Sequence, residues 1–416
     1  MLTHPAPSLN PLLLDTGSPP IPEVHAWAVR YAGAAGPMLD MCQAAPGHPP
    51  APELLARLAH EAGQAGNARY GAIIGDPALR ETYAAWVSET HAGHVGADQV
   101  AITAGCNQAF TLAMMAVAQR GDRVVLPAPW YWNHKMTLDM LGIDAVPLPC
   151  SAAAGFVPDP EAAEALLDGR TRALVLITPN NPTGAVYPPE VIAAFQALCR
   201  RRGVWLVLDE TYRDLLPTGQ PRGHDLFADP EWSSSLIGLY SFSKAFAVPG
   251  HRLGAIMADA SLMTQFYKVL DCLHVCPGRT AQAAMTWAIP ALRDWRAAQR
   301  VEVNARADAM RSVLSRLPGW EADALGAYFA YVRHPFPGVP AVQVAERLAV
   351  ERGVMCLPGP AFGPGQDGHL RLAFAGADVG RIALLEERLA GMDGERSVHV
   401  LDRMVELGRP NSVRIA

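Results

Sequence analysis

Short apolar runs alternate with longer stretches of helical periodicity through the middle of the chain. Six runs are apolar on both faces, as the strands of a buried sheet are: 100–103, 124–126, 174–177, 204–208, 236–240 and 253–257. Helical patterns follow them, at 107–119, 189–202 and 281–317. This alternation predicts an α/β fold, in which a mostly parallel sheet is covered by helices on both faces.

The chain changes character after residue 278. It becomes helical and then offers two further runs of strand character, at 327–332 and 369–374, which predict a smaller α+β domain. The N-terminal segment is rich in proline, unlike the central part, and we expect it to join this smaller domain. We therefore predict a large domain over residues 46–300 and a small domain formed by 1–45 and 301–416. A weak helical pattern at 398–407 receives no role.

Composition narrows the class of protein. The chain has 416 residues, of which 50% are hydrophobic, so it can bury a large core. Its net charge of −6 comes without a basic stripe, which argues against nucleic acid as a partner. Seven cysteines lack metal-ligand spacing, so we predict no metal site, no disulfide framework and a reducing compartment. Because no signal peptide and no membrane-spanning apolar run is found, we expect a soluble cytoplasmic protein.

Lysine is rare, because only Lys135, Lys244 and Lys268 occur among 34 basic residues. Lysine, unlike arginine, can lose its proton and attack a carbonyl to form a Schiff base. Lys135 and Lys268 lie in helix-like stretches without neighbouring chemistry. Lys244 instead ends the segment 241–244 after a buried run, and Arg252 follows eight positions later. Hydroxyls, backbone amides and a cation at a strand end form an anion site, and a lysine beside a phosphate site is the arrangement for pyridoxal phosphate.

Polar and aromatic groups also follow four other expected strands. The five segments after the strands are 104–108, 127–132, 178–184, 209–212 and 241–244. Ligands of open α/β sheets bind at the carboxyl ends of the strands, so we expect these segments to converge on one cleft.

Together these segments resemble the class I/II aminotransferases, fold-type I pyridoxal-phosphate enzymes related to aspartate aminotransferase. The resemblance covers about residues 40–390, and its motifs occur in the family order: 70–71 with 75–80, 105, 129–134, 180–184, 209–212, 241–244, 252, 358–363 and 371. It implies a large domain with a mostly parallel sheet of the seven-stranded type between helices, plus a smaller α+β domain. It also implies pyridoxal 5'-phosphate as cofactor and a homodimer that moves an amino group between an amino acid and a 2-oxo acid.

The resemblance assigns the reactive part of the cofactor to four residues. Lys244 would carry the cofactor covalently and then move the substrate's α-proton. Asp209 would keep the pyridine nitrogen protonated, although by itself an aspartate at a strand end is equally typical of a helix N-cap. Tyr212 and Asn181 would bond the phenolic oxygen from two sides.

The phosphate group would meet several donors. The implied donors are the backbone amides of Gly105, Cys106 and Asn107 and the side chains of Ser241, Ser243 and Arg252. The family usually has a small residue or a hydroxyl where Cys106 stands, which puts a side-chain bond there in doubt. Tyr70 resembles a tyrosine that reaches across a dimer interface to the partner's phosphate.

The remaining predicted residues would contact the face of the cofactor ring or the substrate. Tyr131 is expected to lie on the cofactor ring, with Trp130 as the alternative, because three consecutive aromatics leave the register open. Arg371 alternates with apolar neighbours and is the expected anchor for the substrate carboxylate; a structural ion pair is the alternative. Ala44 lies where the family commonly has a glycine, which narrows the space beside the substrate.

Three questions stay open from the sequence. The same scaffold supports β-elimination, as in C–S lyases, and a non-catalytic cofactor-binding regulatory module is a weaker alternative. A second substrate carboxylate would need another cation, for which Arg279 and Arg69 are unplaced candidates. The aromatic residues at 130–132 and 328–329 favour a hydrophobic or aromatic substrate.

Overall fold

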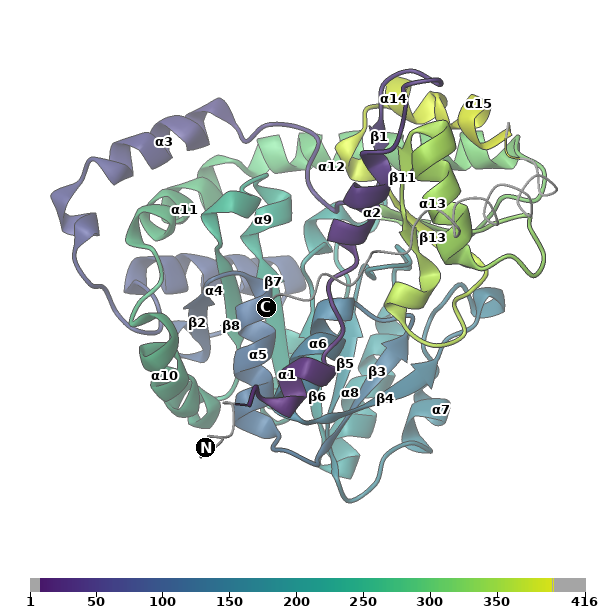
Figure 1. Cartoon of the computed structure of the whole chain (residues 1–416). Coiled ribbons are helices and arrows are strands. Elements are labelled where there is room, and N and C mark those ends of the chain that lie inside the picture. The colour runs from purple at the N-terminus through teal and green to yellow at the C-terminus, as the bar shows by residue number, and fades with distance from the viewer. Residues whose placement is uncertain (1–7, 391, 393–416) are drawn as a thin grey trace, which may run out of the picture.

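A seven-stranded sheet forms the centre of the computed structural model, which describes residues 8–390 and 392 (Figure 1). In spatial order its strands are β2 (Val100–Thr103), β8 (Gly254–Met257), β7 (Leu236–Ser241), β6 (Trp205–Asp209), β5 (Thr171–Ile177), β3 (Arg123–Ala128) and β4 (Asp144–Pro149). β8 runs antiparallel to both of its neighbours, and the other pairs are parallel. The predicted mostly parallel sheet is confirmed.

The central strands are apolar on both faces because each face packs against its own helical layer. Along β5, Leu174 and Leu176 join one hydrophobic cluster, while Ala173 and Val175 join the cluster on the opposite face. The helices of this part of the chain are α3 (Pro52–Ala62), α4 (Pro77–His91), α5 (Cys106–Val117), α6 (Trp132–Leu141), α7 (Pro160–Glu164), α8 (Pro189–Arg202), α9 (Phe242–Ala245), α10 (Ala260–His274) and α11 (Arg279–Ala291). Period-2 alternation of side chains thus places the core on two sides of one sheet.

The helical pattern over 281–317 is divided between two helices in the structure. The structure has two helices there, α11 and α12 (Arg293–Ser315), with Leu292 between them. Pro290 lies in the last turn of α11. A proline inside a helix lacks the backbone N–H and crowds the preceding turn, so the helix ends just after it.

The smaller unit is built on an antiparallel sheet of four strands, β12-β13-β10-β9. Its strands are β9 (Glu321–Gly326), β10 (Phe329–Arg333), β12 (Leu357–Pro358) and β13 (His369–Ala373), and its helices are α13 (Ala341–Arg352), α14 (Val379–Ala383) and α15 (Leu385–Ala390). Figure 1 shows this unit at the upper right, beside the large sheet. Both strands expected in this region, at 327–332 and 369–374, are confirmed.

The N-terminal segment contacts both units. β1 (Leu39–Asp40) pairs in parallel with β11 (Val354–Met355), and α2 (Ile21–Ala28) packs on α13. α1 (Pro11–Asp15), by contrast, packs on α6 of the large unit. Prolines in the first turn of α1 and α2 suit the start of a helix, because that position needs no backbone N–H. The exact domain boundaries stay a prediction, and the pattern at 398–407 lies outside the described residues.

Among the described residues, no helix is both long and apolar enough to cross a bilayer.

Candidate active site

A cavity of about 330 Å³ lies where the five strand-end segments meet. Twelve residues singled out from the sequence line it: Ala44, Cys106, Asn107, Tyr131, Asn181, Asp209, Tyr212, Ser241, Ser243, Lys244, Arg252 and Arg371. The cavity also contains residues that sequence reasoning missed. Pro19 and Ile21 come from the N-terminal segment, which the chain's fold, and no local motif, brings to this place.

Lys244 lies on α9, which begins directly after β7. The hydroxyl of Ser241 caps this short helix by accepting a hydrogen bond from the Ser243 amide at 3.3 Å. The Lys244 ammonium donates to the carbonyl oxygen of Ala44. Burial, together with the charges of Arg371 and Arg252, lowers the pKa of Lys244 to about 8. Roughly a tenth of this side chain is therefore a free amine at pH 7, far more than for an unperturbed lysine.

The lowered pKa predicts how the addition of an aldehyde to Lys244 depends on pH. Only the neutral amine attacks, so the rate should rise with pH and level off above about 8, well below the usual lysine value of 10.5. Stopped-flow absorbance after mixing cofactor-free protein with pyridoxal phosphate measures this rate, with Lys244→Ala as the blank. A rate that still climbs beyond about pH 10 would show an unperturbed lysine.

Asp209 ends β6 with both carboxylate oxygens engaged. Oδ1 accepts the Thr211 amide at 2.9 Å, as in a local turn, while Oδ2 faces Cys106 Sγ at 3.4 Å and His134 Nε2 at 3.5 Å. Stacking on Phe110, at 3.8 Å between ring centroids, fixes the His134 ring. The carboxylate thus combines an Asx-type turn with a fixed orientation beside the cavity. Sequence reasoning included His134 only within the motif 129–134 and did not predict its contact with Asp209. A histidine three positions after Tyr131, at the start of a helix, was the available signal.

The floor next to Arg252 is shaped to admit an anion. Gly105, at the start of α5, has a φ of +87°, and a Cβ there would lie 2.3 Å from Arg252 Nη2. The positive φ favours glycine at this position, and the missing Cβ leaves room for the Arg252 guanidinium beside it. The buried Ser243 hydroxyl has no hydrogen-bond partner among the described residues. Buried polar groups are normally bonded, so Ser243 Oγ and the open helix N-terminus fit an oxyanion.

Arg371 is fully buried, at 0% exposure, on β13. It donates to Asn181 Oδ1 at 3.1 Å and to the Cys42 carbonyl oxygen, while its Nε has no partner among the described residues. Within that part of the chain it forms no ion pair with a carboxylate, unlike the structural pair considered from the sequence. Burial lowers the pKa of Arg371 to about 10. A buried cation with a free N–H fits a carboxylate ligand.

The three consecutive aromatics separate in the structure. Tyr131 and Trp132 line the cavity, whereas Trp130 lies outside it. The Trp130 ring packs over Gly363, where a Cβ would lie 3.0 Å from Trp130 Cε2. The Trp132 ring centroid lies 5.1 Å from the Arg371 guanidinium carbon. Burial raises the pKa of Tyr131 to about 12, so its phenol stays neutral.

Three predicted or candidate residues stand apart from the cavity of their own chain. Tyr70 is 81% exposed, and Arg69 is exposed beside it. Arg279 bonds to Asp76 at 3.3 Å and to the Gly66 carbonyl oxygen at 2.7 Å. It is thus engaged elsewhere, and does not line this cavity.

Comparison with known proteins places the chain in a family. The model for aminotransferase class I and II matches residues 37–389. An arginine–pyruvate transaminase of Pseudomonas aeruginosa is 31% identical over 79% of this chain and 84% of its own, and a probable aspartate/prephenate aminotransferase of Thermus aquaticus is 32% identical over 74% and 80%. The structure of Thermus thermophilus aspartate aminotransferase with maleate superposes with a TM-score of 0.84 at 27% identity, covering 92% of this chain and 99% of that one. The chain belongs to the class I and II aminotransferases.

Proposed function

We propose that this chain is a pyridoxal-phosphate-dependent transaminase that moves an amino group between an amino acid and a 2-oxo acid. One observation carries the proposal. A buried lysine of lowered pKa, a partnerless serine hydroxyl and a buried arginine with a free N–H line the same cavity. The lysine fits an aldehyde, the serine hydroxyl a phosphate and the arginine a carboxylate.

The residues present fit pyridoxal phosphate. Lys244 would hold its aldehyde carbon, Asp209 its ring nitrogen, and Asn181 and Tyr212 its phenolic oxygen. The phosphate would take the amides at 105–107, Ser241, Ser243 and Arg252, and Tyr131 would cover the ring. When bound, the cofactor supplies the carbonyl that takes up the amino group and a ring that accepts the electrons released at the substrate's α-carbon.

The chain's own groups bind, orient and move a proton. Arg371 would bind the α-carboxylate and thereby fix the α-carbon near Lys244. The Lys244 amine would take the α-proton and return it, a role that suits its lowered pKa. His134 holds the orientation of the Asp209 carboxylate. The second substrate, a 2-oxo acid, would use the same carboxylate contact in the reverse direction.

The cavity favours an uncharged substrate side chain. Its cationic lining residues are Lys244, Arg252 and Arg371, and the proposal gives each of them another role. Pro19, Ile21 and Trp132 supply apolar wall instead. An acidic side chain would therefore find no uncommitted cation among the described residues that line the cavity, in agreement with the hydrophobic or aromatic substrate favoured by the sequence.

We further propose a cytoplasmic homodimer in which Tyr70 enters the partner's cavity. The exposure of Tyr70, at 81%, and its place outside its own cavity support this arrangement. All seven cysteines are free, which supports a reducing compartment.

A donor screen tests the function. Purified protein with pyridoxal phosphate is given leucine, phenylalanine, aspartate or arginine, with and without pyruvate or 2-oxoglutarate. We expect turnover to require the 2-oxo acid and to favour the uncharged donors. With cysteine or cystathionine, whose sulfur is a leaving group on the β-carbon, pyruvate and ammonia released without an acceptor would instead indicate β-elimination. Cofactor binding without any turnover would indicate a regulatory module.

A further inference from the structure

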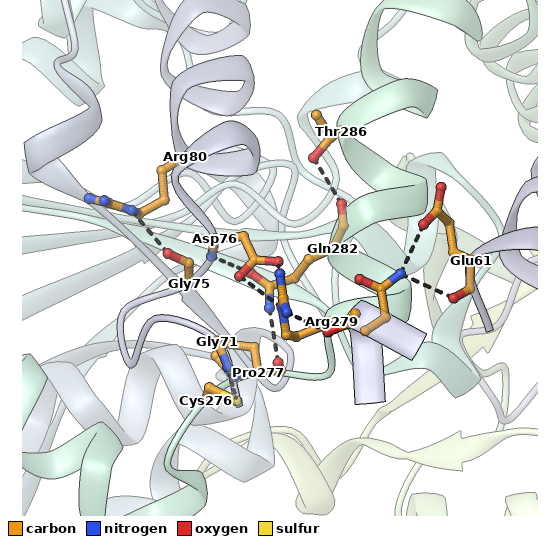
Figure 2. A network of polar contacts seen from close by, with 12 residues as sticks. Glu61, Gly71, Gly75, Asp76, Arg80, Cys276, Pro277, Arg279, Gln282 and Thr286 are labelled. Carbon is orange, nitrogen blue, oxygen red and sulfur yellow. Dashed lines mark hydrogen bonds and ion pairs between the residues drawn. The ribbon is translucent and has the colours of Figure 1, made fainter. Parts of the chain in front are cut away.

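The loop that carries Tyr70 runs from Gly66 to Asp76, directly before α4. Figure 2 shows Asp76, the last residue of this loop, facing Arg279 in the first turn of α11. Arg279 Nε lies 3.3 Å from both carboxylate oxygens of Asp76, and its Nη1 donates to the Gly66 carbonyl oxygen at 2.7 Å. One guanidinium therefore joins the beginning of the loop to its end, in the planar geometry that arginine provides.

Gln282, one turn along α11, makes the second connection. Its Oε1 accepts the Asp76 amide at 2.7 Å, and its Nε2 donates to the Pro277 carbonyl oxygen at 2.9 Å. The side chain is fully buried, at 0% exposure. Both of its polar atoms are thus satisfied inside the protein, which fixes Asp76 from the backbone side.

The middle of the loop is held as well. The amide of Gly71 donates to Cys276 Sγ at 3.3 Å. A Cβ at position 71 would lie 2.7 Å from Asp76 Oδ1 and 2.9 Å from Arg279 Cδ, so only glycine lets the loop approach this pair. Gly75 has a φ of +98°, and a Cβ there would lie 2.5 Å from Ile102 Cγ1. The backbone beside Tyr70 is therefore fixed while the Tyr70 side chain is exposed.

We propose that Arg279 and Gln282 are positioning residues that hold the 66–76 loop so that Tyr70 projects into the cavity of a second copy. The inference rests on the homodimer proposed above. A loop fixed in advance lowers the entropy cost of inserting its side chain. Arg279 would affect the cavity of the second copy only through Tyr70. Because it is bonded to Asp76, it is not available to bind a substrate carboxylate.

Arg279→Ala tests the loop, with Arg293→Ala as the matched control. Arg293 also pairs with a carboxylate, that of Glu89 at 2.7 Å, but on the exposed surface of α12. We expect Arg279→Ala to weaken pyridoxal-phosphate binding on the order of 10- to 100-fold, because a small misplacement of a contact group carries that cost. Hydrogen exchange of the 66–76 amides should quicken, and Arg293→Ala should leave both quantities at the wild-type level.

A hybrid dimer shows whether the effect crosses the interface. Arg279→Ala and Lys244→Ala chains, co-expressed with different tags, yield hybrids with one site that has its own Lys244 and receives an intact loop from the partner. At a cofactor concentration that saturates the wild-type protein but not the Arg279→Ala homodimer, we expect that hybrid to show about half of the wild-type turnover, since a two-fold dimer has two equivalent sites. A hybrid no more active than the Arg279→Ala homodimer would overturn the proposal.

The outcomes separate this inference from the proposed function. If the wild-type protein fails to take up the cofactor, the proposed function fails, while hydrogen exchange still reports on the loop. If Arg279→Ala matches Arg293→Ala in cofactor binding, the positioning role is overturned and the function stands. If the alanine variant does not fold, Arg279→Lys takes its place, because lysine keeps the positive charge but lacks the planar, forked guanidinium. We expect Arg279→Lys to weaken cofactor binding too. Wild-type cofactor binding in this variant would contradict the positioning role of Arg279.

Discussion

Lys244→Ala should abolish amino transfer, with turnover lower by at least about 10⁴-fold, because the variant loses both the covalent attachment point and the group that moves the α-proton. No other amine could replace it, because Lys244 is the one lysine among the described residues that line the cavity. Steady-state turnover with the preferred donor measures the loss. The visible absorbance of the bound cofactor should change in parallel, because no lysine nitrogen is left to hold it.

The scarcity of lysine provides clean controls for this variant. Lys135 pairs with Asp139 on α6, and Lys268 bonds to Gln265 on α10, both outside the cavity. Lys135→Ala and Lys268→Ala should therefore keep wild-type turnover and absorbance. Near-normal turnover of Lys244→Ala would show that the reaction does not pass through this amine.

Arg371→Gln should lower kcat/KM on the order of 10²- to 10³-fold. Removing one partner of a buried charge pair costs about 2 to 5 kcal/mol, and here the partner would be the substrate carboxylate. The variant leaves Asn181 Oδ1 without its 3.1 Å donor, so part of the loss will reach the cofactor side as well. Kinetics with an amino acid and with the matching amine, which lacks the carboxylate, separate these two effects.

Arg388→Gln controls for the loss of a buried arginine. Arg388 is also buried, but it donates to the carbonyl oxygens of Gly353 and Pro37 inside the smaller unit. We expect this variant to melt at a lower temperature with KM unchanged. An amino-acid preference over the matching amine that survives in Arg371→Gln would remove Arg371 from the carboxylate contact.

The strands of the large sheet that are buried on both faces could be predicted from the sequence. β2, β5, β6, β7 and β8 are apolar on both faces, and the sequence located each of them. β4 was missed, because it is an edge strand with alternating exposure and prolines at 147 and 149. The break at Leu292 was missed because the hydrophobic pattern continues through it. The hydrophobic pattern of a sequence shows which positions are buried. An edge strand or a break between two helices changes that pattern little, so neither was visible in it.

The site was predictable where chemistry follows a strand end. Lys244, Asp209 and Asn181 all come directly after buried strands, and all line the cavity. Pro19 and Ile21 carry no chemical signature, and their presence depends on how the N-terminal segment crosses between the two units. The choice between Tyr131 and Trp130 depended on the packing of Trp130 against Gly363, a contact far apart in the sequence. Long-range contacts of this kind are decided by the fold.

Reduction of the cofactor-loaded protein with borohydride, followed by peptide mapping, identifies the residue that holds the cofactor. Borohydride makes the bond between a lysine nitrogen and the pyridoxal carbon permanent, so the modified peptide identifies the attachment point. We expect one pyridoxyl group per chain, on Lys244. A label on Lys135 or Lys268, or a protein that takes up no cofactor at all, would contradict it.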